Sequence, residues 1–364
     1  MNRWVTPTSN VEKDFIKQAF AKGQRIDGRK LYDFRRTDIK FSLDDSSATV
    51  CLGNTKVLAV VSAEISEPFP DRPSEGTIQF RVEFSPMASP EFEPGRPGEA
   101  AVEVTRIIER SLRDSRALDT ESLVILSGLK VWHVRCDVHV LDHDGNLMDA
   151  CSLAALAALL AFRRPDVTVG GATGKELTVH PKEEREPIPL TIHHLPLAVS
   201  MGVYEDGVCA VDPSLKEEAT MSARITCVLN KQQELCFLQK AGGAGLSLSA
   251  VGHCLDIAEQ KVAEITEALD AALEEHSKLR VQARVRRHAA EVARHGGTGS
   301  GPPASGRGSW RAAAVAMRSV APGGGPGQPG TPAGLAGSSD SSDGSEDEED
   351  GPPSEGMKGD GETR

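Results

Sequence analysis

A row of arginines is the feature of this sequence best suited to binding a ligand. Arg106, Arg110 and Arg113 recur at three- and four-residue steps, so a helix would carry them on one face. Arg96 precedes them between two glycines, which leave the backbone beside its guanidinium uncrowded. The spacing predicts a cationic helix face that attracts an anion, and the positive end of the helix dipole adds to that attraction.

The same spacing has a plainer interpretation. Glu99 and Glu103 fall on the face that carries the arginines. Surface ion pairs such as Glu103 with Arg106 would then take up the charge, and each would contribute only about a few tenths of a kcal/mol. Spacing alone leaves both interpretations open.

A loop and a helix must position this row. Residues 85–98 contain four prolines, which is typical of irregular chain, and a helical period begins at Pro97-Gly98-Glu99. The apolar positions on the opposite side of that helix are Val104, Ile107, Ile108 and Leu112. We therefore expect an amphipathic helix with the arginines facing outward.

Apolar alternation predicts strands in both halves of the chain. In the first half they fall near residues 39–43, 48–52, 56–63, 78–84, 122–126 and 130–141. Residues 147–162 are apolar and small on nearly every side, so we expect a helix buried between layers. From Pro187 short strands appear again, and a long helix starts near Ser249. This order predicts an α+β protein of two similar βα lobes in one compact unit.

The predicted boundaries divide the chain into three parts. The first lobe spans residues 1–165, and the second, with its long helix, spans 166–295. Residues 296–364 are rich in Gly, Pro and Ser and are expected to be disordered. Within them, residues 338–350 form a serine-rich acidic run, which is either a phosphorylatable interaction segment or a solubilising one.

Charge limits the kind of anion site that this chain can form alone. The formal net charge is −12, and the last 69 residues carry 10 acidic and 5 basic groups, so residues 1–295 stand at −7. An acidic body is not typical of a free-standing nucleic-acid binder. A nucleic-acid site would have to be a local patch or be completed by a partner.

Cysteine usage and hydropathy indicate the compartment. The seven cysteines form no CxxC pair and mostly sit in apolar runs, so we expect reduced core residues of an intracellular protein. No signal peptide precedes the first helix, and the apolar run at 153–162 is too short to cross a bilayer. No membrane association is predicted.

Catalytic and metal motifs are not found in the sequence. The segment GGATGK (170–175) has the wrong glycine spacing for a phosphate loop, and Glu176 stands where Ser or Thr would bind magnesium. Asp142-His143-Asp144 and His193-His194 could each supply metal ligands. Neither is accompanied by a further ligand at a spacing typical of a metal site. Residues 25–29 (RIDGR) are predicted to form a solvated, charged turn. We predict no catalytic residue, no metal site and no cofactor.

Five segments in order resemble the RNase PH family. They are RIDGR (25–29), ATVCLGNTKVLAVVSAE (48–64), FEPGRPGE (92–99), LDHDGNLMDACSLAALAALL (141–160) and VDPSLKEEATM (211–221). The resemblance covers roughly residues 10–275 and implies an RNase PH fold (ribosomal protein S5 domain 2-like). The third and fourth segments are most similar to the non-phosphorolytic branch, which builds the hexameric ring of the eukaryotic RNA exosome.

That branch implies a set of partners. They are RNA, an active-type RNase PH-like subunit as heterodimer partner, the other ring subunits, the cap proteins and an associated nuclease. It also implies a role in rRNA maturation and RNA turnover, and residence in the nucleus, nucleolus and cytoplasm.

The resemblance also bears on catalysis. Phosphorolytic members carry Gly-Thr-Arg, whose Thr and Arg hold the attacking phosphate, where this chain has Gly145, Asn146 and Leu147. Leucine cannot neutralise a phosphate dianion, and such electrostatic stabilisation is usually the largest catalytic term. The two acidic residues of active members align roughly with Glu186 and Ile192. We expect a non-catalytic subunit; the alternative is an active phosphorolytic 3′-to-5′ exoribonuclease.

The arginines match family positions that face the RNA path. On this resemblance Arg96, Arg106, Arg110 and Arg113 are the predicted RNA-binding residues. Each phosphate contact on a single strand adds about 0.7 to the log-log salt slope, so three or four contacts give a slope of about −2 to −3. The isolated chain is expected to bind RNA weakly.

Overall fold

The computed structural model describes residues 8–295, except 96, 171–175, 183, 205–206 and 244. The described residues belong to one compact unit. The predicted disordered tail (296–364) and most of the GGATGK segment lie outside the described residues. Arg96 also lies outside them.

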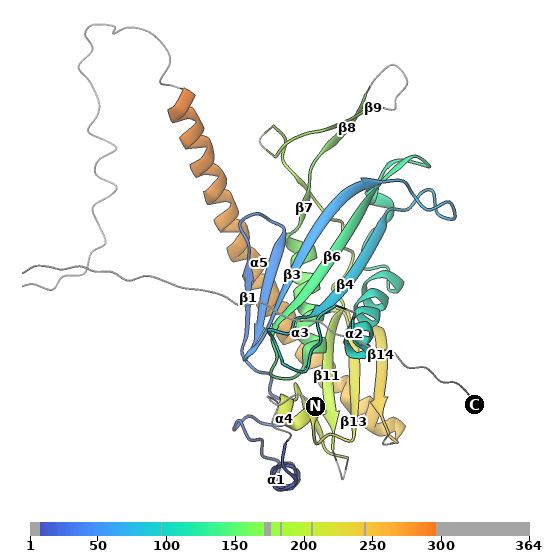
Figure 1. The fold of residues 1–364 in the computed structure, drawn as a ribbon, viewed down its shortest axis with the longest axis vertical. Helices are drawn as coiled ribbons and strands as arrows, with labels where there is room; N and C mark the ends of the chain where they lie inside the picture. Colours follow the sequence, from blue (N-terminus) through green and yellow to red (C-terminus); the bar gives the residue numbers. More distant parts are fainter. Residues whose placement is uncertain are drawn as a thin grey trace, which may run out of the picture. The chain divides into compact units, whose positions relative to one another are not determined.

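The first sheet contains six strands and carries the N-terminal half of the chain (Figure 1). Its strands are β1 (Thr37–Phe41), β2 (Ser47–Leu52), β3 (Thr55–Ser66), β4 (Thr77–Phe84), β5 (Val124–Leu126) and β6 (Lys130–Asp142). The order is β1-β2-β3-β6-β4, with β5 paired to β6. All pairs are antiparallel except β4 with β6. The predicted alternation holds in β6, where Trp132, Val134 and Cys136 are buried and Arg135 between them is exposed.

The second sheet contains four strands. They are β11 (Leu197–Val203), β12 (Cys209–Val211), β13 (Ala223–Leu229) and β14 (Leu235–Gly242). Their order is β12-β11-β13-β14, and every pair is antiparallel, so β14 is an edge strand. Between the two sheets along the chain lie short strand pairs, β7 (Arg163–Arg164) with β10 (Ile188–Pro189), and β8 (Val167–Gly170) with β9 (Glu176–Val179).

The helices are α1 (Asn10–Ala21), α2 (Glu99–Glu109), α3 (Leu147–Ala161), α4 (Leu215–Glu218) and α5 (Leu248–His295). A π-helical turn (Arg110–Asp114) continues α2, and a 3-10 turn (Glu121–Leu123) precedes β5. α1 begins with a capping box, in which Ser9 and Glu12 bond each other's backbone. Its Phe20 stacks on Tyr204 of the second lobe, with ring centroids 3.9 Å apart.

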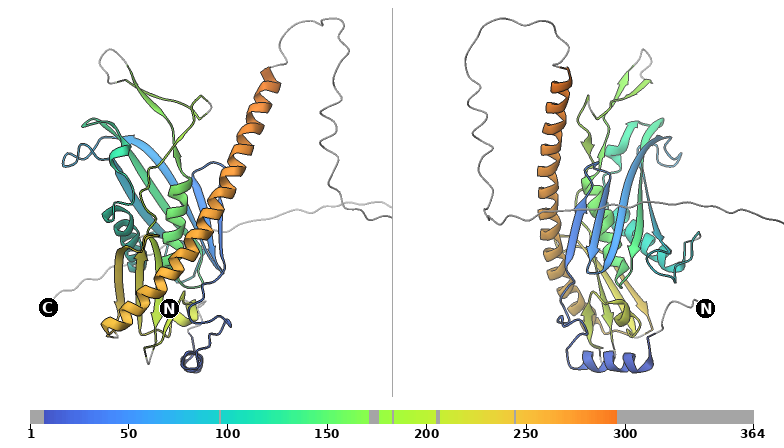
Figure 2. Two further views of the ribbon diagram at one scale, coloured as in Figure 1. Left: turned by 180° about the vertical axis from the view of Figure 1, so that it is seen from behind. Right: turned by 60° about the vertical axis from the view of Figure 1, so that its left-hand side comes forward.

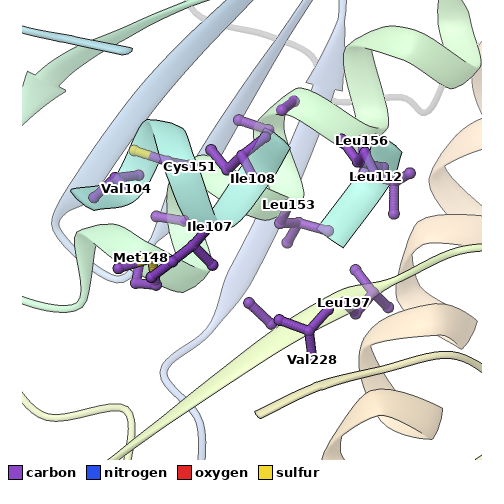
Figure 3. Packing of buried hydrophobic residues seen from close by; sticks show 14 of the residues in the cluster. Val104, Ile107, Ile108, Leu112, Met148, Cys151, Leu153, Leu156, Leu197 and Val228 are labelled. Carbon is purple, nitrogen blue, oxygen red and sulfur yellow. The ribbon is translucent and has the colours of Figure 1, made fainter. Parts of the chain in front are cut away.

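α3 is the centre of the fold. As its composition predicts, it is buried on nearly every side, because alanines let the neighbouring layers approach closely. In Figure 3, Met148 and Cys151 of α3 lie beside Val104, Ile107 and Ile108 of α2. One hydrophobic cluster includes α3 and both sheets, so the two lobes share a core.

α5 runs along the second sheet and past the first (Figure 2). Ala258, Val262, Ile265 and Leu269 form a buried apolar stripe on α5. Further along the helix the stripe ends, since Val285 is 63% exposed. Within the part of the chain that the structure describes, every helix is too short or too polar to cross a membrane.

Candidate nucleic-acid interface and the polar network at the start of α3

α2 presents the predicted cationic face. Gly98 caps the helix without a side-chain hydrogen bond, and Glu99 lies in its first turn. The four apolar residues predicted to be buried are all buried, with 0–4% of their surface exposed: Val104, Ile107, Ile108 and Leu112. Arg106 and Arg110 are exposed on the other side. The sequence pattern thus predicts the orientation of this helix correctly.

The π-helical turn divides the arginine row. It widens the helix after Glu109, so the residues that follow do not continue the α-helical spacing. Arg113 Nη1 lies 2.6 Å from Glu109 Oε1, and Arg113 lines a separate hollow with Arg72, Arg116 and His193. The ion-pair interpretation therefore describes Arg113.

Glu103 does not pair with Arg106, as the plainer interpretation assumed. Its Oε1 accepts from Arg224 Nη2 at 3.0 Å and from Gln239 Nε2 at 2.7 Å, both on the second sheet. Among the described residues, Arg106 and Arg110 take part in no salt bridge. Their charge is available to a ligand.

Arg106 and Arg110 line a groove of about 980 Å³ between α2 and β14. Lys240 of β14 lines the same groove from the opposite side. No sequence pattern indicated this lysine, because more than a hundred residues separate it from the arginine row and only the fold brings them together. Arg96, the remaining predicted contact, lies outside the described residues.

The second charged region lies where α3 begins. Asn146, the N-cap residue, adopts a left-handed conformation with φ +52°. Its Nδ2 donates to Asp149 Oδ2 at 2.8 Å and to Asp212 Oδ1 at 2.7 Å. Its backbone N–H donates to Glu218 Oε1 at 2.8 Å. Three carboxylates therefore surround the start of this helix.

Gly145 makes the close approach possible. Its φ is +86°, and a Cβ there would lie 2.7 Å from Pro213 O and 2.5 Å from Leu215 N. Any other residue would push α4 away from the start of α3, so the glycine holds Glu218 within reach of Asn146.

Asp212 holds two arginines. Arg35 Nη2 donates to its Oδ1 at 2.8 Å, and Arg29 Nη1 donates to its Oδ2 at 3.0 Å. Burial alone would raise the pKa of Asp212, but the hydrogen bonds and charge of Arg35, with the Asn146 amide, hold it below its usual value. Arg35 Nη2 also donates to Gly145 O at 3.1 Å. The cations nearest the start of α3 are thus already bonded.

Arg25 corrects the prediction of a solvated turn at residues 25–29. Its side chain and that of Glu217 are both 0% exposed and form a salt bridge. Arg25 Nε donates to Glu217 Oε1 at 3.0 Å, and Nη1 donates to Val211 O at 2.7 Å. The charged turn is an anchor between the lobes, and a local charge pattern could not reveal a partner 192 residues away.

Asp149 is another titratable group of this network whose pKa is shifted. Burial raises its pKa to about 7, although hydrogen bonds from the Ser200 backbone and from Asn146 oppose that shift. Its Oδ2 accepts from Ser200 N at 2.9 Å, while Oδ1 is buried without a partner.

The acidic residues proposed from the alignment are elsewhere. Glu186 Oε1 forms a salt bridge with Arg284 Nη1 of α5 at 2.7 Å. Ile192 forms an isolated antiparallel β-bridge with Leu118. The carboxylates beside Asn146 are instead those of Asp149, Asp212 and Glu218. The rough alignment with Glu186 and Ile192 therefore missed the acidic residues nearest Asn146, because distant segments supply them.

The histidines considered as metal ligands have structural contacts. His143 Nδ1 accepts from Gly145 N at 3.3 Å, and burial lowers the pKa of His143. His194 Nε2 lies 3.1 Å from Ser115 Oγ. No group of three His, Cys, Asp or Glu that could hold a metal occurs in the described ranges.

Comparisons with known proteins agree with this architecture. The model of domain 1 of the 3′ exoribonuclease family (RNase PH) matches residues 33–165, and that of domain 2 matches residues 194–261. The exosome of Archaeoglobus fulgidus with RNA bound to the active site is structurally similar, with a TM-score of 0.63 at 33% identity over 71% of this chain and 98% of that one. An archaeal exosome core gives a TM-score of 0.60 at 30% identity over 72% of this chain and 97% of that one.

Curated relatives are similar over most of the described residues. Exosome complex component RRP45A of Arabidopsis thaliana is 48% identical over 278 residues, which cover 76% of this chain and 91% of the relative. Exosome complex component RRP45 of Homo sapiens is 45% identical over 276 residues, or 76% of this chain and 62% of the relative. The chain thus spans less than two thirds of the human protein.

The N-terminal segments SNVE and RIDGR and the acidic end also resemble, within this family, the ring subunit known as the polymyositis/scleroderma autoantigen. The predicted RNase PH fold is confirmed by the family matches and by the archaeal structures. This chain belongs to the RNase PH family of 3′ exoribonucleases and is similar in particular to exosome complex component RRP45.

Proposed function

We propose that this chain is a ring subunit of the RNA exosome that binds RNA and holds its ring partners without cleaving RNA itself. Its similarity to exosome complex components of the RRP45 type supports the assignment to that assembly. The archaeal exosome structures, one with bound RNA, support the same assignment. The role would be in 3′-to-5′ RNA processing and degradation, including rRNA maturation and RNA turnover.

The proposed lack of catalysis rests on the polar groups at the start of α3. Phosphate would have to bind where this chain has Asn146 and Leu147 in place of the Thr and Arg of active members. The Asn146 amide is taken up by Asp149 and Asp212, and its backbone N–H by Glu218. A phosphate dianion would meet the carboxylates of Asp212 and Glu218 there instead of a free donor, and like charges at such range repel strongly. Arg35, the nearby cation, is bonded to Asp212.

The RNA contact rests on α2. Arg106 and Arg110 are exposed and unpaired among the described residues, which supports direct bonds to phosphate oxygens. Arg113 contributes less, because Glu109 already neutralises it. Arg96 remains part of the proposal on the family resemblance.

The proposed partners follow from the same family. They are an active-type RNase PH-like subunit as heterodimer partner, the other ring subunits, the cap proteins and an associated nuclease. We also propose residence in the nucleus, nucleolus and cytoplasm, which a fluorescent fusion of the full chain would test.

One assay separates the proposal from its alternative, an active phosphorolytic exoribonuclease. The match to the 3′ exoribonuclease family favours that alternative. The ring is reconstituted with this chain and with a heterodimer partner inactivated at its phosphate site, then given labelled RNA and inorganic phosphate. We expect no release of nucleoside diphosphates. Release that disappears with Asn146→Ala and Asp212→Asn in this chain would overturn the proposal.

A further inference from the structure

The groove that contains Arg106 and Arg110 is built from both lobes. One wall is α2 of the first lobe, and the other is β14, the edge strand of the second sheet. The two elements lie side by side in both views of the fold (Figures 1 and 2). A ligand in this groove would contact segments that are far apart in the sequence.

The charge in the groove is positive once its internal bonds are counted. The carboxylate of Glu103 is used by Arg224 and Gln239. Arg106 and Arg110 keep free guanidinium groups on the α2 wall, and Glu99 is the other carboxylate that lines the groove.

Lys240 lines the groove from the β14 wall. Its side chain is exposed, and its Nζ donates to Gly242 O at 2.9 Å. An ammonium group has three donors, so two remain for a ligand. The three cations thus lie on two walls, and a linear polyanion can contact both.

Apolar side chains form part of the same groove. Phe237 and Leu238 of β14 line it, and Leu238 is 41% exposed. An aromatic ring beside cations is the combination that single-stranded nucleic acids use, since phosphates contact the cations and bases stack on the ring.

We propose that the groove between α2 and β14 binds single-stranded RNA, with Lys240 contacting a phosphate opposite Arg106 and Arg110 and with a base against Phe237. This inference rests on the proposed function, which it deepens by adding the second lobe to the RNA site. RNA fits the groove better than a protein strand on the β14 edge, because among the described residues Arg106, Arg110 and Lys240 form no salt bridge with a carboxylate.

The test uses the exosome ring reconstituted with this chain and an unstructured oligouridylate. Lys240→Ala should weaken binding by about two- to fivefold at moderate salt, which is the range of one exposed ion pair. It should also lower the magnitude of the log-log salt slope by about 0.7. Lys240→Arg should restore both. Lys231→Ala is the matched control, since Lys231 is exposed in the β13–β14 turn and pairs with Asp270 outside the groove.

Crosslinking locates the RNA independently of affinity. An oligonucleotide with 4-thiouridine, irradiated on the ring, should give adducts on Phe237 or Leu238 that Lys240→Ala reduces. Adducts confined to other segments would overturn the inference.

The remaining outcomes separate this inference from the proposed function. If Arg106→Ala weakens RNA binding while Lys240→Ala does not, RNA does not bind across the groove. The proposed RNA contact on α2 then still holds. If neither variant matters, the RNA contact of the proposed function falls as well. If Lys240→Glu blocks ring assembly, the β14 edge is a protein interface and the inference is overturned.

Discussion

The groove beside α2 and the network at the start of α3 use the same residue types in opposite ways. In the groove, Arg106 and Arg110 are exposed and unpaired among the described residues. At the start of α3, Arg25 and Arg35 are buried and bonded to carboxylates from another lobe. An arginine is a candidate ligand contact only where the fold brings no carboxylate to it, so the partner rather than the arginine distinguishes a binding surface from an anchor.

The largest expected effect is on stability, when the salt bridge between Arg25 and Glu217 is removed. Arg25→Ala would leave Glu217 buried without its partner, which costs about 3–5 kcal/mol of unfolding free energy. Chemical denaturation measures it. Arg36→Ala is the control, since Arg36 is 85% exposed beside Asp38 and should change stability by less than about 0.5 kcal/mol. Equal effects of the two variants would contradict the comparison.

The second prediction concerns pH. The pKa of Asp149 is raised from 3.8 to about 7, so the folded state keeps a proton that the unfolded state releases. The stability from that proton is complete below pH 3.8 and is lost as pH rises through about 7. Asp149→Asn removes this titration.

Denaturation from pH 4 to 7.5 compares the two proteins. The wild-type protein should lose about 3 kcal/mol relative to Asp149→Asn over this range. Parallel stability profiles would show that Asp149 is ionised in the folded protein over the whole pH range. They would contradict the claim that burial raises its pKa.

The third prediction concerns the groove. The double substitution Arg106→Ala and Arg110→Ala should weaken RNA binding by the reconstituted ring by about tenfold and lower the magnitude of the salt slope by about 1.4. Fluorescence anisotropy at several salt concentrations measures both. Unfolding free energy should stay within about 0.5 kcal/mol of wild type, because neither side chain forms a salt bridge with another described residue. A large loss of stability would mean that these arginines are structural.

The smallest expected effect sharpens the comparison within the row. Arg113→Ala should weaken RNA binding by about twofold or less, since Glu109 already pairs with Arg113. In the Glu109→Gln background Arg113 is released, and the same substitution should then cost more. An effect as large as that of Arg106→Ala would show that the π-helical turn does not divide the row.

Local patterns predicted most of the fold. The apolar side of α2, the alternation of β6 and the buried alanine-rich α3 all follow from periodicity, because each depends only on neighbouring residues. The exposure of Arg106 and Arg110 follows from the same argument.

The charge partners could not be predicted. Glu103 bonds Arg224, which is 121 residues away, and Arg25 bonds Glu217, which is 192 residues away. The π-helical turn after Glu109 has no sequence pattern that would have predicted it. Lys240 and the carboxylates around Asn146 were missed for the same reason, since a single sequence does not say which distant segments meet.

The bond between Arg25 and Glu217 has a consequence for biosynthesis. A ribosome makes the chain from its N-terminus, so Arg25 emerges long before its partner. Until Asp212, Glu217 and Glu218 follow, Arg25 lacks its carboxylate partner, Arg29 and Arg35 lack Asp212, and Asn146 lacks two acceptors of its hydrogen bonds. The first lobe therefore cannot complete its structure during translation of residues 1–165, and nascent chains stalled there should be sensitive to protease. Folding that waits for such distant contacts is slow, which makes this chain a candidate for chaperone assistance before it reaches its partners.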